Sequence, residues 1–232
     1  MFDIGFTMPV DMGGGFMVAL VGDPSIEPSI VTNYELAYDR SLTPTINLRA
    51  AVFYQETQDV KGTFGGAPDY LPPSTPVVSF AFGNRGDTNI AGAEITLAGR
   101  PAGGWAWDVN YTYKTVEDDL AAFAVNTPLN FEAATPSHLA NAHLGWTSGR
   151  ITVDGYANYT SGIEMPVQSV FGAISLVPID SHLALSFRGA YQVNDHFSIA
   201  LNAQNANFDD AEVTNTFGQS ESRFWLSFAA GF

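Results

Sequence analysis

Apolar and polar residues alternate with a period of two along much of this chain. The clearest run, WAWDVNYTY at residues 105–113, places Trp, Val and Tyr on one side of an extended strand and Ala, Asp, Asn and Thr on the other. Alternation of this kind is typical of a β-strand whose two faces meet different surroundings. It recurs in nine segments, at residues 33–39, 45–55, 91–98, 105–113, 139–147, 151–160, 181–191, 196–204 and 222–232. The pattern therefore predicts an all-β protein.

The segments that join these expected strands alternate between short and long. Short connections with Gly, Pro, Asn or Asp, which favour tight turns, lie at residues 40–44, 99–104, 147–150 and 193–195. Long connections lie between them, at roughly residues 59–87, 117–136, 161–179 and 206–221. Tight turns on one side and long loops on the other are the layout of an antiparallel outer-membrane β-barrel. If the last strand ends at the periplasmic side, every long connection is extracellular.

The two faces of the expected strands favour lipid on one side and water on the other. Aromatic residues gather near the turns on the apolar face, at Trp105, Trp107, Tyr113, Trp146, Tyr159 and Tyr191. They resemble the interfacial girdles of outer-membrane barrels. Because backbone groups cannot stay unpaired in hydrocarbon, such strands must belong to a closed barrel. Residues 2–10 could add a tenth strand, although Pro9 would interrupt its ladder.

Composition narrows the function classes. Charged residues make up 14% of the 232 residues, below the roughly 25% of an average soluble domain. The net charge of −15 argues against nucleic-acid binding, which needs concentrated Lys and Arg. The absence of Cys excludes disulfides and thiolate metal sites. Many acids fall in the expected long connections, including the run Glu117, Asp118 and Asp119.

Several stretches, taken in order, resemble the C-terminal half of the barrel of TonB-dependent outer-membrane receptors. They are DPSIEPSIVTNYELAYDR (23–40), GAEITLAGRPAGGWAWDVNYTY (92–113), TPSHLANAHLGW (135–146), FSIALNAQNANFDDAEV (197–213) and SRFWLSFAAGF (222–232). The resemblance implies that residues 1–232 are a partial barrel domain without the family's plug domain. Nine or ten strands would then be the last part of a barrel of about 22 strands.

The resemblance also implies a function. The parent protein would take up a scarce nutrient, such as a ferric chelate, cobalamin or an oligosaccharide, across the outer membrane of a Gram-negative bacterium. Its partners would be outer-membrane lipid and the barrel-assembly machinery, with the TonB complex added only if the full-length protein carries a plug. Without a plug, this chain is expected not to perform gated transport. The alternatives are a small complete barrel acting as a porin or adhesin, and a soluble β protein.

Charged residues on the polar face are the candidate site. Those expected to face a lumen are Arg49, Glu94, Asp108, His143, Asp154, Arg188 and Arg223. No pair of histidines has zinc-ligand spacing, and catalytic pairs such as Asp180 with His182 are disfavoured, so no catalytic, cofactor or metal site is expected. The resemblance further implies that the alternating C-terminal residues Phe224, Leu226, Phe228 and Phe232 are a signal read by the barrel-assembly machinery.

Overall fold

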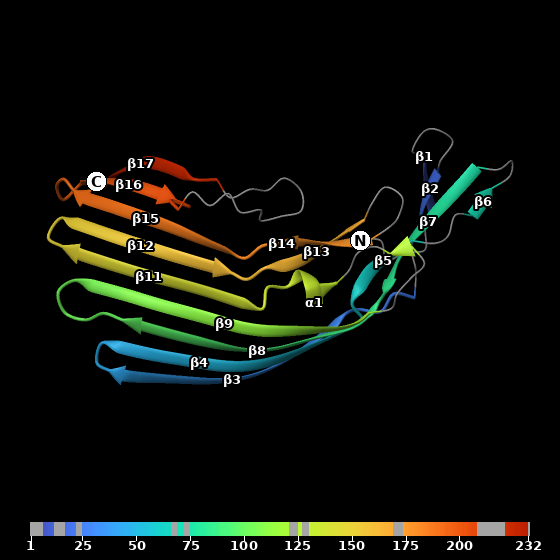
Figure 1. Ribbon diagram of the computed structural model, residues 1–232, viewed down its shortest axis with the longest axis horizontal. Helices are drawn as coiled ribbons and strands as arrows, with labels where there is room; N and C mark the ends of the chain where they lie inside the picture. Colours follow the sequence, from blue (N-terminus) through green and yellow to red (C-terminus); the bar gives the residue numbers. More distant parts are fainter. Residues whose placement is uncertain are drawn as a thin grey trace.

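The chain folds almost entirely into β-strands, with a single helical turn among the described residues (Figure 1). This computed structural model describes residues 7–11, 17–21, 25–65, 69–71, 75–120, 125–126, 130–168, 174–207 and 221–231. In these ranges, no helix has the length and hydropathy that a bilayer span requires.

Nine strands form one antiparallel sheet, which we name the wall. In spatial order from one edge they are β3 (Ile30–Thr43), β4 (Ile46–Gln58), β8 (Gly86–Gly99), β9 (Trp105–Leu120), β11 (His138–Ser148), β12 (Ile151–Thr160), β15 (His182–Gln192), β16 (Phe197–Gln204) and β17 (Arg223–Ala230). Each of the nine predicted segments overlaps one of these strands. The order follows the chain, so the wall is an up-and-down meander, visible as the curved row in Figure 1. The predicted antiparallel all-β architecture is confirmed.

The remaining elements lie in the N-terminal part and in the long connections. Six strands make a separate sheet: β1 (Thr7–Asp11), β2 (Met17–Val21), β5 (Lys61–Gly65), β6 (Asp69–Leu71), β7 (Thr75–Asn84) and β10 (Val125–Asn126). Strands β13 (Ile163–Gln168) and β14 (Ile174–Ile179) form a hairpin, and α1 (Phe131–Ala134) is the helical turn. The long connections therefore carry secondary structure of their own.

The prediction that residues 2–10 could add a tenth strand to the wall is wrong for residues 7–10, which are the part of this range that the structure describes. Residues 7–11 form β1, which pairs with β2 and not with a wall strand. Proline removes a ladder donor and is therefore confined to sheet edges. Pro9 lies on β1, which is the terminal strand of its own sheet, so the position suits it.

The expected boundary of the long connection at residue 117 is also wrong. Strand β9 continues to Leu120, and Glu117, Asp118 and Asp119 pair in register with Asn89, Thr88 and Asp87 of β8. Hydrophobic alternation reports the surroundings of a strand, whereas the backbone ladder needs no apolar side chains. The ladder thus continues past Tyr113, where the apolar pattern ends.

Wall strands pair in a common register, so that each side of the sheet keeps one chemical character. One row of directly opposed residues crosses seven strands and reads Tyr38, Ala50, Ile95, Tyr111, Ala140, Tyr159 and Leu183. We name this side the apolar face. Its large side chains are open to the surroundings, and Leu36 and Phe228 are 73% and 75% exposed. A sheet with nine strands of such residues on one side needs an apolar solvent on that side.

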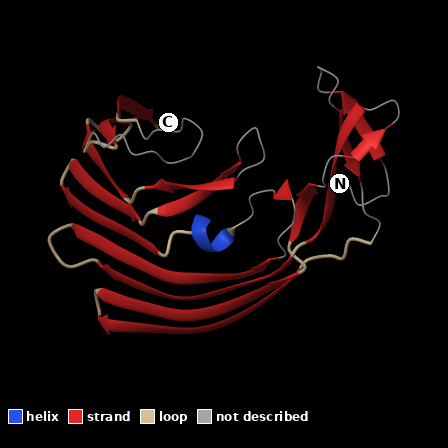
Figure 2. Ribbon diagram, turned by 45° about the vertical axis from the view of Figure 1, so that its right-hand side comes forward, coloured by secondary structure: helices blue, strands red, loops and turns tan. Residues whose placement is uncertain are grey.

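The other side of the wall is its concave face. Asp118 projects to this side, in register with Thr88, and accepts hydrogen bonds from the first amides of α1. Figure 2 shows α1 within the hollow of the curved sheet. Concavity brings neighbouring side chains together, so Ala51, Thr112 and Ala200 on this side are buried.

The face assignment predicts that the same substitution destabilises the protein more at one of two adjacent positions than at the other. Val109 lies in the middle of the apolar stretch of β9, and Asn110 lies on the concave face. Val109→Arg is expected to lower the free energy of unfolding in a lipid bilayer by about 2–4 kcal/mol, the cost of a cation near the bilayer midplane. Urea titration of the reconstituted protein measures this loss.

Asn110→Arg is the matched control. It removes the hydrogen bond to the Thr96 hydroxyl, which is worth about 0.5–1.5 kcal/mol, but places no charge in lipid. Equal losses in the two variants would contradict the face assignment.

Candidate functional site

All seven charged residues that the sequence singled out lie on the concave face. Direct cross-strand pairs establish this, because opposed residues share a side of the sheet. The pairs that place them are Arg49 with Thr96, Glu94 with Thr112, Asp108 with His143, Asp154 with Arg188, and Gln204 with Arg223. That this face lines a lumen stays a prediction.

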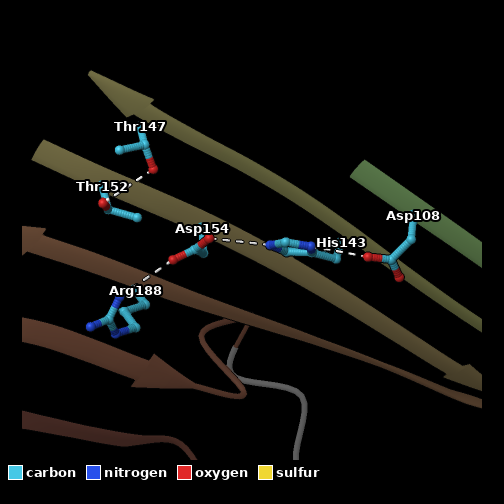
Figure 3. Close-up of polar contacts among 6 residues, drawn as sticks. All are labelled: Asp108, His143, Thr147, Thr152, Asp154 and Arg188. Carbon is cyan, nitrogen blue, oxygen red and sulfur yellow. Dashed lines mark hydrogen bonds and ion pairs between the residues drawn. The ribbon is translucent and has the colours of Figure 1, made fainter. Parts of the chain in front are cut away.

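Four of the seven join into one polar ladder that crosses four strands. The Asp108 carboxylate on β9 lies 3.1 Å from Nδ1 of His143 on β11. Nε2 of the same ring lies 3.2 Å from the Asp154 carboxylate on β12. The second oxygen of Asp154 lies 3.5 Å from the Arg188 guanidinium on β15. Figure 3 shows the four side chains in a line across the concave face. We name this set the Asp–His–Asp–Arg ladder.

His143 is the centre of the ladder. Both of its ring nitrogens face carboxylate oxygens, and an ionised carboxylate only accepts hydrogen bonds. Only the doubly protonated imidazolium donates to both carboxylates at once, whereas a neutral ring has a single donor. The ring also stacks on Tyr156, with centroids 4.7 Å apart and planes 14° from parallel. Side chains of His143 and Asp154 are 23% and 14% exposed, so these bonds are partly shielded from water.

No role was predicted for Tyr156 from the sequence. It is an aromatic residue between the polar Asp154 and Asn158 on the side of β12 that was expected to be wet. An aromatic side chain at a polar position could have marked Tyr156 as unusual. Its contact with His143 follows only from the register, which sets the two residues opposite each other.

The other three candidates stand apart from the ladder. The Arg49 guanidinium lies 3.7 Å from Glu35 and 3.9 Å from Asp39, and its side chain is 58% exposed. Glu94 accepts a hydrogen bond of 3.4 Å from the Thr112 hydroxyl, and Arg223 pairs with Glu221 at 3.7 Å. The contacts of Arg49 and Glu94 join neighbouring strands, whereas Arg223 and Glu221 lie two residues apart in the same segment. These contacts do not converge on a common point.

A hollow of about 500 Å³ opens beside the ladder, at the end of the wall that carries the short turns. Its lining residues include Asn47, Arg100, Asp108 and His143. It offers amide, guanidinium and carboxylate groups to a polar partner. The described residues contain no group of three or more His, Asp or Glu placed to hold a metal ion. The two ring nitrogens of His143 point to opposite sides, which suits a bridge between strands better than a metal site.

The C-terminal residues assigned to assembly lie on the apolar face where the structure describes them. Phe224, Leu226 and Phe228 of β17 oppose Ala203, Leu201 and Ile199 of β16. Phe232 lies outside the described residues. Near this end, Nδ1 of His196 lies 3.1 Å from the carbonyl oxygen of Gly231, so the ring is engaged by the backbone after β17.

The ladder predicts a stability difference between two concave-face carboxylates. Asp154→Asn leaves Arg188 and His143 without their shared carboxylate. We expect the free energy of unfolding to fall by about 1–3 kcal/mol, as for a lost hydrogen bond to a charged group in a shielded position. Denaturant titration in a bilayer or micelle measures this change.

Glu35→Gln is the matched control for Asp154→Asn, since it also converts a concave-face carboxylate into an amide next to an arginine. The pair is exposed, so its loss is expected to cost only about 0–1 kcal/mol. A smaller loss from Asp154→Asn than from Glu35→Gln would show that the ladder adds nothing to stability.

Comparison with known proteins agrees with this architecture. Residues 2–206 match the family described as "TonB dependent receptor-like, beta-barrel". No curated protein matches the sequence. Three solved structures are similar at 15% identity and therefore bear on the fold alone. A mutant ferric enterobactin receptor from Pseudomonas aeruginosa has a TM-score of 0.72, with 95% of this chain and 34% of that chain covered.

The other two are similar over comparable lengths. The siderophore receptor PirA from Acinetobacter baumannii has a TM-score of 0.72, with 93% of this chain and 34% of that chain covered. The copper transporter OprC has a TM-score of 0.65, with 90% of this chain and 32% of that chain covered. The chain thus spans about a third of the length of the structures it matches.

Proposed function

The chain belongs to the TonB-dependent receptor-like β-barrel family, and we propose that it forms part of the barrel of an outer-membrane receptor that takes up a scarce nutrient. The family consists of receptors and transporters rather than enzymes. One observation carries the proposal for this chain: the apolar face continues without interruption across the wall, while the seven candidate charged residues lie on the concave face. A barrel wall between lipid and an aqueous interior needs this division.

We place residues 1–232 in the barrel domain, and the barrel in the outer membrane of a Gram-negative bacterium. The stretch of β9 from Trp105 to Tyr113 supports this location. Its nine residues alternate between the two faces of the sheet. A transmembrane β-strand needs ~9–11 residues, so this stretch is long enough to cross a membrane. Beyond Tyr113, the side of β9 that continues the apolar face carries Thr115, Glu117 and Asp119, which suit water above the lipid.

The wall also bears on the small-barrel alternative. Closure of a barrel requires that its first and last strands pair. In the described sheet, β3 and β17 are the two opposite edges. These nine strands therefore need further strands to close, which supports a place in a larger barrel over a porin or adhesin of about ten strands.

We propose a ferric chelate as the first nutrient to test, with cobalamin and oligosaccharides next. Two of the similar structures are a ferric enterobactin receptor and a siderophore receptor, and a third is a copper transporter. The concave face offers a hydrophilic solute both charges and neutral hydrogen-bonding groups. If the full-length protein carries a plug domain, energy would come from the TonB complex acting through that plug.

Uptake in the bacterium that carries the gene tests this function. Deletion of the gene is expected to abolish accumulation of one radiolabelled nutrient among the three classes, and a plasmid copy of the intact gene is expected to restore it. Inactivation of TonB should cause the same loss. Uptake of all three classes that persists after deletion would contradict the proposal, and uptake that needs the gene but not TonB would favour a porin.

Assembly provides a second test, because the barrel-assembly machinery is a proposed partner that reads the C-terminal strand. Phe228 is three-quarters exposed, so its folded-state packing within the chain is slight. Phe228→Ser is nevertheless expected to lower the amount of protein assembled in the outer membrane several-fold. Heat-modifiable mobility of the membrane fraction on gels measures the assembled protein.

Ser227→Ala, one residue away on the concave face, is the control and is expected to assemble normally. Deletion of Phe232 is expected to act like Phe228→Ser. Normal assembly of both aromatic variants would remove the support for a C-terminal signal.

A further inference from the structure

Residues 130–137 fold back over the concave face at the end of the wall that carries the long connections. They contain α1, which packs against β9 of the wall and against β13. Figure 2 shows the helix inside the hollow of the curved sheet and not beyond its rim. A connection that serves only to join β9 to β11 has no need to enter the hollow.

The carboxylate of Asp118 holds this segment to the wall. One of its oxygens accepts hydrogen bonds from the amides of Phe131 at 2.6 Å and Glu132 at 3.0 Å. Its other oxygen accepts a hydrogen bond from the hydroxyl of Thr88, the residue directly opposite on β8. Thr88 thereby fixes the orientation of the carboxylate, and Asp118 presents an ionised acceptor to the unpaired amides at the start of the helix.

Further bonds set the shape of the segment and tie down its far end. The Asn130 side chain accepts a hydrogen bond of 2.7 Å from the amide of Ala133 and so caps the helix. At the other end, the amide of Lys114 on β9 donates to the carbonyl of Ser137 at 3.0 Å. The same strand thus holds the segment at two points, four residues apart along β9. We name residues 130–137 the inward shelf.

We propose that Asp118 is a latch that keeps the inward shelf over the concave face, and that the shelf narrows the path along the wall at the side from which a solute would enter. A helical turn of four residues has almost no stability of its own, because nucleation costs more than so few bonds return. Its position therefore depends on the groups that bind it. The narrowing of a solute path rests on the proposed function, whereas the latch itself does not.

The chain offers a matched pair of positions for the test. Asp118 and Asp119 are adjacent on β9 and carry the same charge, but their side chains lie on opposite sides of the sheet. Asp118→Ala removes the acceptor of three donors. Asp119→Ala changes the net charge equally and leaves the shelf contacts in place. The chain contains no Cys, so labels can be attached at chosen positions.

The experiment measures the distance between spin labels at Glu132→Cys on the shelf and Ser148→Cys at the short-turn end of β11, in intact protein purified from outer membranes. Both native side chains are exposed. A single narrow distance distribution is expected for the labelled protein that keeps Asp118, and also for its Asp119→Ala variant. Asp118→Ala is expected to raise the fraction of molecules whose inward shelf has left the wall by about ten- to hundredfold, because hydrogen bonds to a charged group are lost. The distance distribution is expected to broaden as a result.

A distribution in Asp118→Ala as narrow as that with Asp118 would overturn the latch. If the alanine variant does not assemble, Asp118→Asn keeps the shape and one acceptor oxygen. Hydrogen exchange at the amides of Phe131 and Glu132 is then expected to accelerate, while the amide of Ala142 in the wall keeps its rate. Unchanged exchange at both helix amides would equally overturn the latch. Neither result depends on uptake, so failure of the latch is distinct from failure of the proposed function.

Discussion

The register of the nine-stranded wall determines which side chains share an environment, because successive residues of a strand point to opposite sides. A slip of one residue between any two wall strands would exchange the faces of every strand beyond it. The pairing instead keeps Leu48, Leu97 and Val109 in one row and Asn47, Ala98 and Asp108 in the next. In hydrocarbon, the backbone groups of these strands also need partners, which neighbouring strands supply. The same pairing between strands therefore supplies the backbone hydrogen bonds and determines the face on which each side chain lies.

The polar contacts of the concave face follow from this register. Asp108, His143, Asp154 and Arg188 belong to four different strands, and they meet because each pairing holds them on the same side at nearly the same height. His143 lies between two carboxylates, so the ladder alternates negative and positive groups when the imidazolium is formed. Such alternation limits the cost of placing charges on a partly shielded wall. The ladder and the latch at Asp118 occupy opposite ends of this face.

Local pattern was sufficient to locate the nine wall strands and insufficient for the contacts between them. Alternation in WAWDVNYTY predicts a strand and its faces because the period of two is a local property. It could not predict that β9 continues through Glu117 to Leu120, because that extension depends on pairing with Gly86 to Asn89. Proline at position 9 argued correctly against a wall strand, yet the separate sheet required pairing with β2, which no local pattern reveals. The partners of His143 and the hydrogen bonds from the first amides of α1 to Asp118 are likewise tertiary.

The central claim is that the apolar face meets lipid and the concave face meets water, and the four tryptophans test it directly. Trp105, Trp107 and Trp146 lie on the apolar face, and Trp225 lies on the concave face. Fluorescence of single-tryptophan variants in bilayers is to be quenched with brominated lipid and with aqueous iodide. The account predicts strong lipid quenching of Trp105, Trp107 and Trp146, and strong iodide quenching of Trp225. Iodide quenching of all four to the same extent, with none by brominated lipid, would contradict it.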